Sequence, residues 1–305
     1  MFSRFSPLAN FLLRSNRHLE TVLINQGRAL ARLNETVNSA MLSDYEFKVF
    51  SQWGEDGIIQ FLTSSVHIDH KVFVEFGVED FQESNCRFLM MKDYWRGLVI
   101  DGSKKNTEKI KNSYFCWQYS LQAVNAFITP GNIDDILTRS GFPKNIGILS
   151  IDIDGVDYYV WEALKDWTPS IIVAEYNGLF GEDFPVSVPL DDKFQRTKAH
   201  YSNQYYGASL GAFAYLASQR DYALVGVNSA GSNAFFVRRD LLNDRVGEVR
   251  VKDCFRSTFF NEGRDESGAL AHRSAIKKRE IIAHLPLFNV ASGEYLTVGD
   301  LHIKP

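Results

Sequence analysis

Residues Val72–Ser103 read VFVEFGVEDFQESNCRFLMMKDYWRGLVIDGS, an alternation of apolar and polar segments typical of an α/β protein. An apolar run, Val72–Phe76, leads into a turn at Gly77 and a helical stretch. A second apolar run, Gly97–Ile100, then ends in Asp101. Strand, glycine turn, helix, strand and terminal acid form half of a nucleotide-binding unit, whose last carboxylate can accept both hydroxyls of a ribose. The stretch therefore predicts a nucleoside ligand, with an ordinary βαβ unit as the alternative.

The composition of the 305-residue chain excludes several classes of protein. Its formal charge of -4 and pI near 6.0 argue against a nucleic-acid partner bound through bulk electrostatics. The three cysteines, Cys86, Cys116 and Cys254, are far apart and lack metal-ligand spacing, which favours a reducing compartment. No apolar run approaches the roughly 20 residues of a transmembrane helix. We expect a cytoplasmic protein without a transmembrane segment.

Residues 1–43 differ from the rest of the chain and are predicted to form an amphipathic, coiled-coil-like helix. They carry five arginines and two glutamates, and their apolar residues keep a heptad spacing from Leu12 to Ala40. This spacing favours a homo-oligomer assembled through the helix. The helix could instead pack on its own domain, or lie on the inner face of the membrane. We expect a core domain at 44–242 and a C-terminal extension at 243–305 packed on it.

The remaining apolar runs predict further strands of one sheet. Ile146–Ile153 and Ser170–Ala174 are nearly continuous apolar runs, as in buried parallel strands. Tyr222–Val227 and Ala234–Arg238 are predicted to form a closing pair joined by a hairpin-type turn. The polar and aromatic connection at 178–206 is long enough to be a substrate lid. Together these runs predict an α/β, mostly parallel sheet.

Acids and an amide follow the predicted strands where each one ends. They are Glu75, Asp101, Asp152, Asp154, Glu175 and Asn177. Ligands of parallel sheets bind at this edge, and carboxylate and amide oxygens suit a hard divalent ion. Asp154, Glu175 and Asn177 are therefore candidate ligands of Mg²⁺ or Mn²⁺. Binding of substrate hydroxyls or capping of helices is the alternative.

The turn after the first strand distinguishes two kinds of cofactor. It reads GVEDFQ, with one glycine and two acids, whereas a nicotinamide dehydrogenase requires G-x-G-x-x-G. Acids beside a pyrophosphate are unfavourable, so a cationic nucleoside without phosphate, such as S-adenosylmethionine, fits better. A nicotinamide-dependent oxidoreductase remains the alternative. Further candidates for the cofactor pocket are Gly102 and Ser103, which follow Asp101, and Glu55, which lies ahead of the first strand. The alternative for the acidic residues ahead of this strand is a structural one, in which Asp56 is the N-cap of a helix.

Five segments resemble the FkbM-type class I methyltransferases: VFVEFGVEDFQESNCRFL, GLVIDGS, LSIDIDGVDYYVWEAL, IIVAEYN and GASLGAFAYLASQRDYALVGVNSAGSNAFFVRRDL. The resemblance covers about Ser51 to Leu242. It implies a Rossmann-like class I methyltransferase sheet whose last strand is antiparallel. It also implies S-adenosylmethionine-dependent O-methylation of a sugar, sugar nucleotide or glycan, consistent with tailoring of a surface polysaccharide.

The resemblance also implies roles for single residues. Glu75 and Gly77 would face the methionine part of the cofactor, and Asp101 its ribose. Asp152 and Asp154 would lie near the methyl acceptor, and Asp152 is also a candidate for contact with the cofactor.

Methyl transfer to a hydroxyl requires a base, a metal ion or both. Asp154, Asp152 and His200, which lies in the long connection, are the candidate catalytic residues. The connection also contains candidates for a wall on which a sugar stacks, Tyr201, Tyr205 and Tyr206. A non-catalytic scaffold of a glycan-synthesis complex is the alternative from a different class, in which the acidic turn has lost its cofactor.

Overall fold

A computed structural model describes residues 7–258 and 263–302, with side chains from Arg17 onward. Parts of two predicted segments lie outside the described residues, namely 1–6 of the N-terminal helix and 259–262 and 303–305 of the C-terminal extension.

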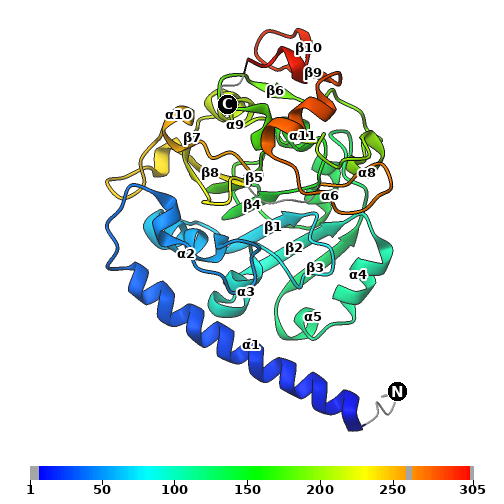
Figure 1. Cartoon of the computed structure of the whole chain (residues 1–305). Coiled ribbons are helices and arrows are strands. Elements are labelled where there is room, and N and C mark those ends of the chain that lie inside the picture. The colour runs from blue at the N-terminus through cyan, green and yellow to red at the C-terminus, as the bar shows by residue number, and fades with distance from the viewer. Residues whose placement is uncertain (1–6, 259–262, 303–305) are drawn as a thin grey trace.

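The core is a seven-stranded sheet in the order β3-β2-β1-β4-β5-β8-β7 (Figure 1). Its strands are β1 Val72–Phe76, β2 Arg96–Asp101, β3 Leu121–Asn125, β4 Ile148–Ile151, β5 Ile171–Glu175, β7 Tyr222–Val227 and β8 Asn233–Arg238. Strands β1 to β5 are parallel, whereas β8 is antiparallel to both of its neighbours, β5 and β7. The last strand of the sheet is thus inserted beside β5. This order confirms the predicted Rossmann-like class I methyltransferase sheet.

Helices cover both faces of the sheet, which explains why its central strands β1, β4 and β5 are mostly apolar and buried. Val74 and Phe76 of β1 face a cluster built with α6, α7 and α9, whereas Phe73 faces one built with α2, α3 and α5. The helices are α2 Glu55–Ser65, α3 Arg87–Asp93, α4 Lys104–Lys111, α5 Phe115–Gln118, α6 Ile133–Arg139, α7 Asp157–Ala163, α8 Arg196–Ala199, α9 Leu210–Gln219, α10 Val251–Cys254 and α11 Ala275–Ile282. The two-sided core fixes the sheet and leaves its strand ends free to build a site.

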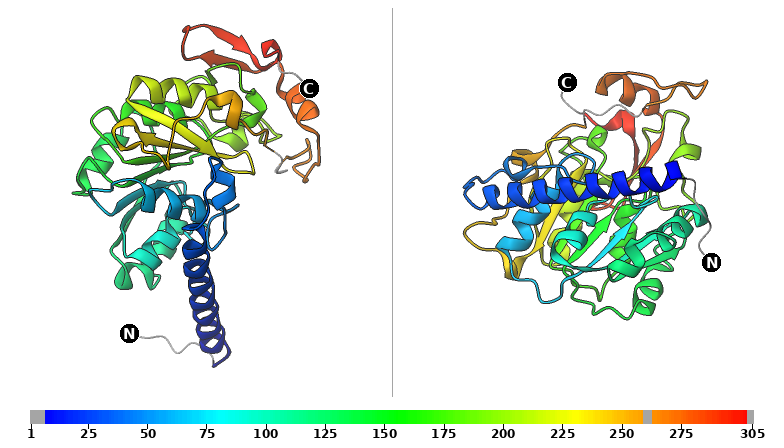
Figure 2. Two further views of the ribbon diagram at one scale, coloured as in Figure 1. Left: turned by 90° about the vertical axis from the view of Figure 1, so that its left-hand side faces the viewer. Right: turned by 90° about the horizontal axis from the view of Figure 1, so that it is seen from below.

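Helix α1, Pro7–Asn34, lies along the outside of the domain beside α2 and α3 (Figures 1 and 2). Gly27 allows the close approach, because a Cβ at this position would lie 2.6 Å from a ring carbon of Phe88. Nearer the N-terminus of α1, Arg87 Nη2 donates to Glu20 Oε1 at 2.5 Å. One face of the predicted amphipathic helix is therefore packed on its own domain.

The outer face of α1 carries apolar side chains that the domain does not cover. Leu19, Val22 and Leu33 are each more than half exposed. Among the described side chains of α1, these three residues form what we call the outer stripe, which a homo-oligomer assembled through α1 could use. Within the described part of the chain, no helix combines the length and the apolar character that crossing a membrane requires.

The C-terminal extension holds the long connection that follows β5. Strand β6, Val186–Ser187, belongs to this connection and pairs with β9, Pro286–Asn289, which pairs in turn with β10, Tyr295–Thr297. A third hydrophobic cluster joins Phe180 and Val186 of the connection to Leu287 of the extension. The connection is therefore anchored at the edge of the domain where the parallel strands end (Figure 1).

Candidate functional site

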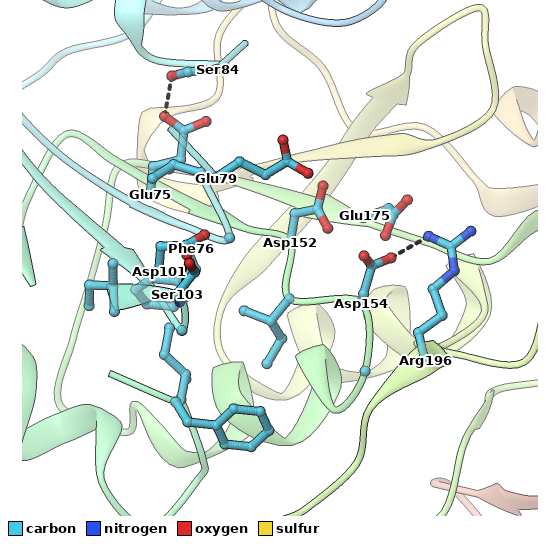
Figure 3. A pocket seen from close by; sticks show the side chains of 18 of the residues that line it. Glu75, Phe76, Glu79, Ser84, Asp101, Ser103, Asp152, Asp154, Glu175 and Arg196 are labelled. Carbon is cyan, nitrogen blue, oxygen red and sulfur yellow. Dashed lines mark hydrogen bonds and ion pairs between the residues drawn. The ribbon is translucent and has the colours of Figure 1, made fainter. Parts of the chain in front are cut away.

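The carboxyl ends of the parallel strands open into a cavity of about 700 Å³. Residues that follow β1 to β4, the end of β5 and part of the connection after β5 line it (Figure 3). The charged side chains of its described lining are Glu75, Glu79, Glu83, Asp101, Asp152, Asp154, Glu175 and Arg196. Seven carboxylates against one guanidinium make the cavity a place for a cation and a poor one for a phosphate.

Glu75, on β1, holds the segment that leads into α3. One carboxylate oxygen accepts from Ser84 Oγ at 2.6 Å and from the Cys86 N–H at 3.2 Å, and the other accepts from the Asn85 N–H at 2.7 Å. The side chain is buried, and this burial raises the pKa of Glu75 to about 7 despite the three donors. Glu75 thus borders the cavity and holds part of its wall in place, and its contact with a cofactor stays a prediction.

The turn after β1 has an unusual backbone. Gly77 has φ of +68°, and a Cβ there would lie 1.7 Å from the carbonyl oxygen of Asp152. No residue but glycine fits this approach of the turn to the end of β4. Glu79 and Phe81 also have positive φ values, +47° and +63°, although neither is glycine. The turn therefore adopts left-handed conformations at alternate positions.

Asp101 ends β2 and leaves one oxygen toward the cavity. Its Oδ1 accepts from the Ser103 N–H at 2.7 Å and from Asn106 Nδ2 at 3.3 Å, whereas Oδ2 has no donor among the described residues. Ser103 Oγ caps α4, and a Cβ placed on Gly102 would have no neighbour closer than 3.8 Å. Both residues line the cavity with Asp101, so the end of β2 offers an open edge to a ligand.

Three carboxylates meet where β4 and β5 end. Oxygens of Asp152, Asp154 and Glu175 lie within 4.8 Å of one another, as expected for neighbouring parallel strands. Burial, and then repulsion from nearby carboxylates, raises the pKa of Asp152 and of Glu175 well above their ordinary values. The cluster thus favours either a bound cation or a retained proton.

The turn after β4 holds itself in place. Asp157 accepts from the Ile153 N–H at 2.7 Å and from the Gly155 N–H at 2.9 Å. Asp154 lies between these two donors in the left-handed conformation, with φ of +55°. The backbone thereby presents the Asp154 carboxylate to the cavity, and Figure 3 shows it directed toward Arg196.

Arg196 comes from α8 in the connection after β5 and was not foreseen from the sequence. Its Nη1 lies 2.5 Å from Asp154 Oδ1, and its Nε donates to the Asn203 carbonyl at 2.7 Å. The guanidinium carbon also lies 4.0 Å from the centre of the Tyr206 ring. Arg196 thus ties the connection to the carboxylate cluster. The sequence feature that could have indicated this role is an arginine within a long connection that follows strands ending in several acidic residues.

Glu55, predicted to bind the cofactor, lies outside the cavity. Its Oε1 accepts from Asn228 Nδ2 at 2.7 Å and from Asn233 Nδ2 at 2.9 Å, and its Oε2 accepts from the N–H groups of Trp53 and Gly54. The cofactor role of Glu55 is wrong because all these donors occupy its carboxylate, which joins the start of α2 to the β7–β8 hairpin.

Asn177, predicted as a metal ligand, also faces away from the carboxylates. Its Oδ1 accepts from the Leu179 N–H at 3.0 Å, and its Nδ2 donates to the carbonyls of Gln204 and Tyr206. The oxygen that would bind a metal is thus used to cap a short 3₁₀ helix. The prediction is corrected accordingly, and Asn177 organises the connection instead.

His200, predicted as a base, does not line the cavity. Its Nδ1 lies 2.7 Å from Ser202 Oγ, and its ring packs beside Tyr201 and His284. Partial burial and then the charge of His284 lower its pKa. The tyrosines do not form the predicted sugar wall either, because Tyr206 is buried under Arg196 and Tyr205 donates to the backbone of the C-terminal extension. The aromatic side chains that do line the cavity are Phe76, Phe127 and Phe194.

Comparisons with known proteins give structural likenesses only. No family model and no curated protein match the chain. The solved structures that it resembles include an O-methyltransferase from Bacillus cereus in complex with SAH, at 10% identity and a TM-score of 0.39, over 70% of this chain and 89% of that one. A putative caffeoyl-CoA O-methyltransferase from Staphylococcus aureus gives 14% identity and a TM-score of 0.40, over 75% of this chain and 98% of that one. Such low identities and TM-scores do not assign an activity to this chain, and its fold is defined by the strand order of the sheet.

Proposed function

We propose that the protein is an S-adenosylmethionine-dependent O-methyltransferase acting on a sugar or glycan hydroxyl. The observation that carries the proposal is the acidic cavity at the ends of β1, β2, β4 and β5 in a sheet with this strand order. A dinucleotide would place two phosphates among seven carboxylates, whereas a sulfonium nucleoside brings a positive charge. The cavity therefore favours S-adenosylmethionine over a nicotinamide cofactor.

The cofactor would lie along the strand ends. Asp101 has a free carboxylate oxygen for the ribose hydroxyls, and the Gly102–Ser103 backbone leaves this edge open. Gly77 brings the turn of β1 against the end of β4, next to the carboxylate cluster. The ribose end and the methyl-donating end of the cofactor would then lie at β2 and at β4, respectively.

The acceptor hydroxyl would be placed at the three carboxylates. In the reaction, a lone pair of its oxygen forms the new O–CH₃ bond, and the methyl–sulfur bond breaks with its electron pair going to sulfur. The hydroxyl proton must go to a base, and the carboxylate oxygens of Asp154 and Asp152 in the cavity are the candidates. Arg196, by holding Asp154, would orient that carboxylate.

A divalent ion fits this cluster in part. Three carboxylate oxygens within 4.8 Å of one another match the hard ligands of Mg²⁺ or Mn²⁺, so Asp152, Asp154 and Glu175 would hold it. Such an ion, when bound, would lower the pKa of a hydroxyl that coordinates it. Arg196 already neutralises part of the negative charge of the three carboxylates. The cluster therefore suits best an ion that binds while the Arg196–Asp154 ion pair stays intact.

The choice of a sugar rests on the sequence resemblance and on the composition of the cavity. Carboxylates accept hydrogen bonds from sugar hydroxyls, and Phe127 and Phe194 offer apolar ring surface in the same cavity. The phosphates of a sugar nucleotide would have to stay outside the acidic lining. We further propose that α1 makes the protein a homo-oligomer through its outer stripe.

The proposed function is tested by incubating purified protein with S-adenosylmethionine labelled in the methyl group and a panel of monosaccharides, sugar nucleotides and short glycans. Transfer of label to a hydroxyl supports the proposal. If the cofactor binds but no hydroxyl compound is labelled, the acceptor class is wrong. If neither S-adenosylmethionine nor its demethylated product binds, the non-catalytic scaffold is favoured.

A further inference from the structure

The turn after β1 keeps the backbone of a glycine-rich loop although glycine occupies only its first position. The φ values at Gly77, Glu79 and Phe81 are +68°, +47° and +63°. Left-handed backbone is unfavourable for residues other than glycine, and such positions concentrate at functional sites. Phe81 has a packing reason, since it is fully buried with its ring edge-on to Phe115. Glu79 is exposed, so packing gives no such reason for its conformation.

Glu79 and its neighbour Asp80 point to different places. Asp80 forms an ion pair with Lys109 of α4, on the outside of the cavity. Glu79 lines the cavity, and Figure 3 shows its side chain directed toward Asp152. Among the described residues, none donates a hydrogen bond to the Glu79 carboxylate or pairs with it. Glu79 is exposed to solvent where it lines the cavity, so its charge faces the ligand space without a partner in the described part of the protein.

The surroundings of Glu79 place it between the two ends of the site. The pKa of Glu79 is raised by partial burial and then by the carboxylates of Asp80, Asp101, Glu83 and Asp154. Asp101 stands at the ribose end and Asp154 at the acceptor end. Glu79 is therefore within electrostatic reach of both.

The chemistry of S-adenosylmethionine fixes where its charge must lie between those ends. Its sulfonium sulfur is bonded to the 5′ carbon of the ribose and to the methyl group that is transferred. With the ribose at Asp101 and the methyl group directed toward Asp154, the sulfonium would lie between them, in the cavity that Glu79 also lines.

We propose that Glu79 supplies the counter-charge for the cofactor sulfonium and thereby makes the site prefer S-adenosylmethionine to its demethylated product. The inference rests on the proposed function and deepens it. Transfer of the methyl group turns the sulfonium into a neutral sulfide, so the attraction to Glu79 ends with the reaction. Because the positive charge on sulfur is already reduced in the transition state, Glu79 favours cofactor binding and product release more than the chemical step.

The test compares the affinities of S-adenosylmethionine and S-adenosylhomocysteine for the full-length protein and for Glu79→Gln, by calorimetric titration. The two ligands share adenosine, ammonium and carboxylate groups and differ in the sulfonium methyl, so the ratio of their affinities isolates its charge. We expect Glu79→Gln to reduce this ratio about tenfold. Asp80→Asn is the matched control, because it removes the neighbouring charge outside the cavity, and it should leave the ratio unchanged.

Three results contradict the inference. Equal loss of both affinities in Glu79→Gln would place Glu79 at the shared ammonium group, and unchanged affinities for both ligands would remove it from the cofactor. The same drop of the ratio in Asp80→Asn would make the effect one of overall charge. All three leave the proposed function intact, whereas failure of the unaltered protein to bind either ligand overturns the proposed function and the inference together.

Discussion

Arg196 Nη1 lies 2.5 Å from Asp154 Oδ1, and this ion pair joins the connection after β5 to the carboxylate cluster. The side chain of Arg196 is only 9% exposed, whereas that of Asp154 is 49% exposed toward the cavity. The pair is thus anchored on the arginine side, by the Asn203 carbonyl and the Tyr206 ring, and open on the carboxylate side. This geometry suits a carboxylate that is oriented yet still accessible to an acceptor.

The first prediction concerns Asp154 as the base. Asp154→Asn should lower kcat by about 10²- to 10⁴-fold, because an amide cannot accept the hydroxyl proton. Steady-state kinetics on an acceptor found by methyl labelling checks this. Glu182→Gln, an exposed position in the same connection, should keep the normal kcat. Normal turnover of the Asp154 variant would place the base elsewhere.

The second prediction concerns the metal. If Asp152, Asp154 and Glu175 hold Mg²⁺ or Mn²⁺, a chelator should abolish turnover, because the acceptor hydroxyl loses the cation that activates it. Adding either ion back should restore turnover. Activity is measured after dialysis against chelator, with Mg²⁺ or Mn²⁺ added back. Full activity in chelator would exclude the metal, and the carboxylates would then act without an ion.

The third prediction concerns the pH dependence of stability. Glu75 has a pKa of about 7 in the folded protein, against an ordinary value of 4.5. Between these values the folded state keeps a proton that the unfolded state has lost, so the contribution of Glu75 to stability is full below pH 4.5 and is lost as the pH rises through 7. At 1.36 kcal/mol per pKa unit, this contribution is on the order of 3 kcal/mol.

Thermal unfolding of the ligand-free protein between pH 5 and 8 measures this dependence. Glu75→Gln should lower the Tm, because the amide cannot accept all three hydrogen bonds, and should also flatten the fall of Tm with pH. An equally steep fall in this variant would assign the dependence to other groups, of which Asp56 and Asp157, each with a pKa raised to about 6 by burial, are the first to examine.

The fourth prediction concerns α1. If its outer stripe joins subunits, Leu19→Glu combined with Leu33→Glu should yield a species of lower mass in light scattering, because the charges would have to be buried in the interface. Thr21→Glu, at another exposed position of α1, is the matched control. An unchanged mass in the double variant would mean that α1 serves only its own domain, where Gly27 packs against Phe88.

The fold could be predicted because its signals are local and repeated. Apolar runs identify β1, β4 and β5 directly, since parallel strands covered on both faces contain few polar residues. The third strand has a weaker signal, because the aromatic segment just before it, Phe115–Gln118, is compatible with a strand but forms a short helix. Its single well-buried residue, Phe115, fits a helical turn as well as a strand.

The candidate site could be predicted only where residues follow a strand. Glu75, Asp101, Asp152, Asp154 and Glu175 reach the cavity because the sheet brings its strand ends together. Other roles depend on contacts that no local pattern specifies. Glu55 is paired with Asn228, 173 residues away, and His200 lies in a connection whose path is set by the C-terminal extension.

The most direct test of the cationic nucleoside site is a calorimetric titration of the purified protein with S-adenosylmethionine and, separately, with NAD. We predict binding of S-adenosylmethionine and none of NAD. Asp101→Ala should weaken the binding by about 2–3 kcal/mol, because the charge-assisted hydrogen bonds to the ribose hydroxyls are lost. Tight binding of NAD together with no response to S-adenosylmethionine would contradict the proposed function.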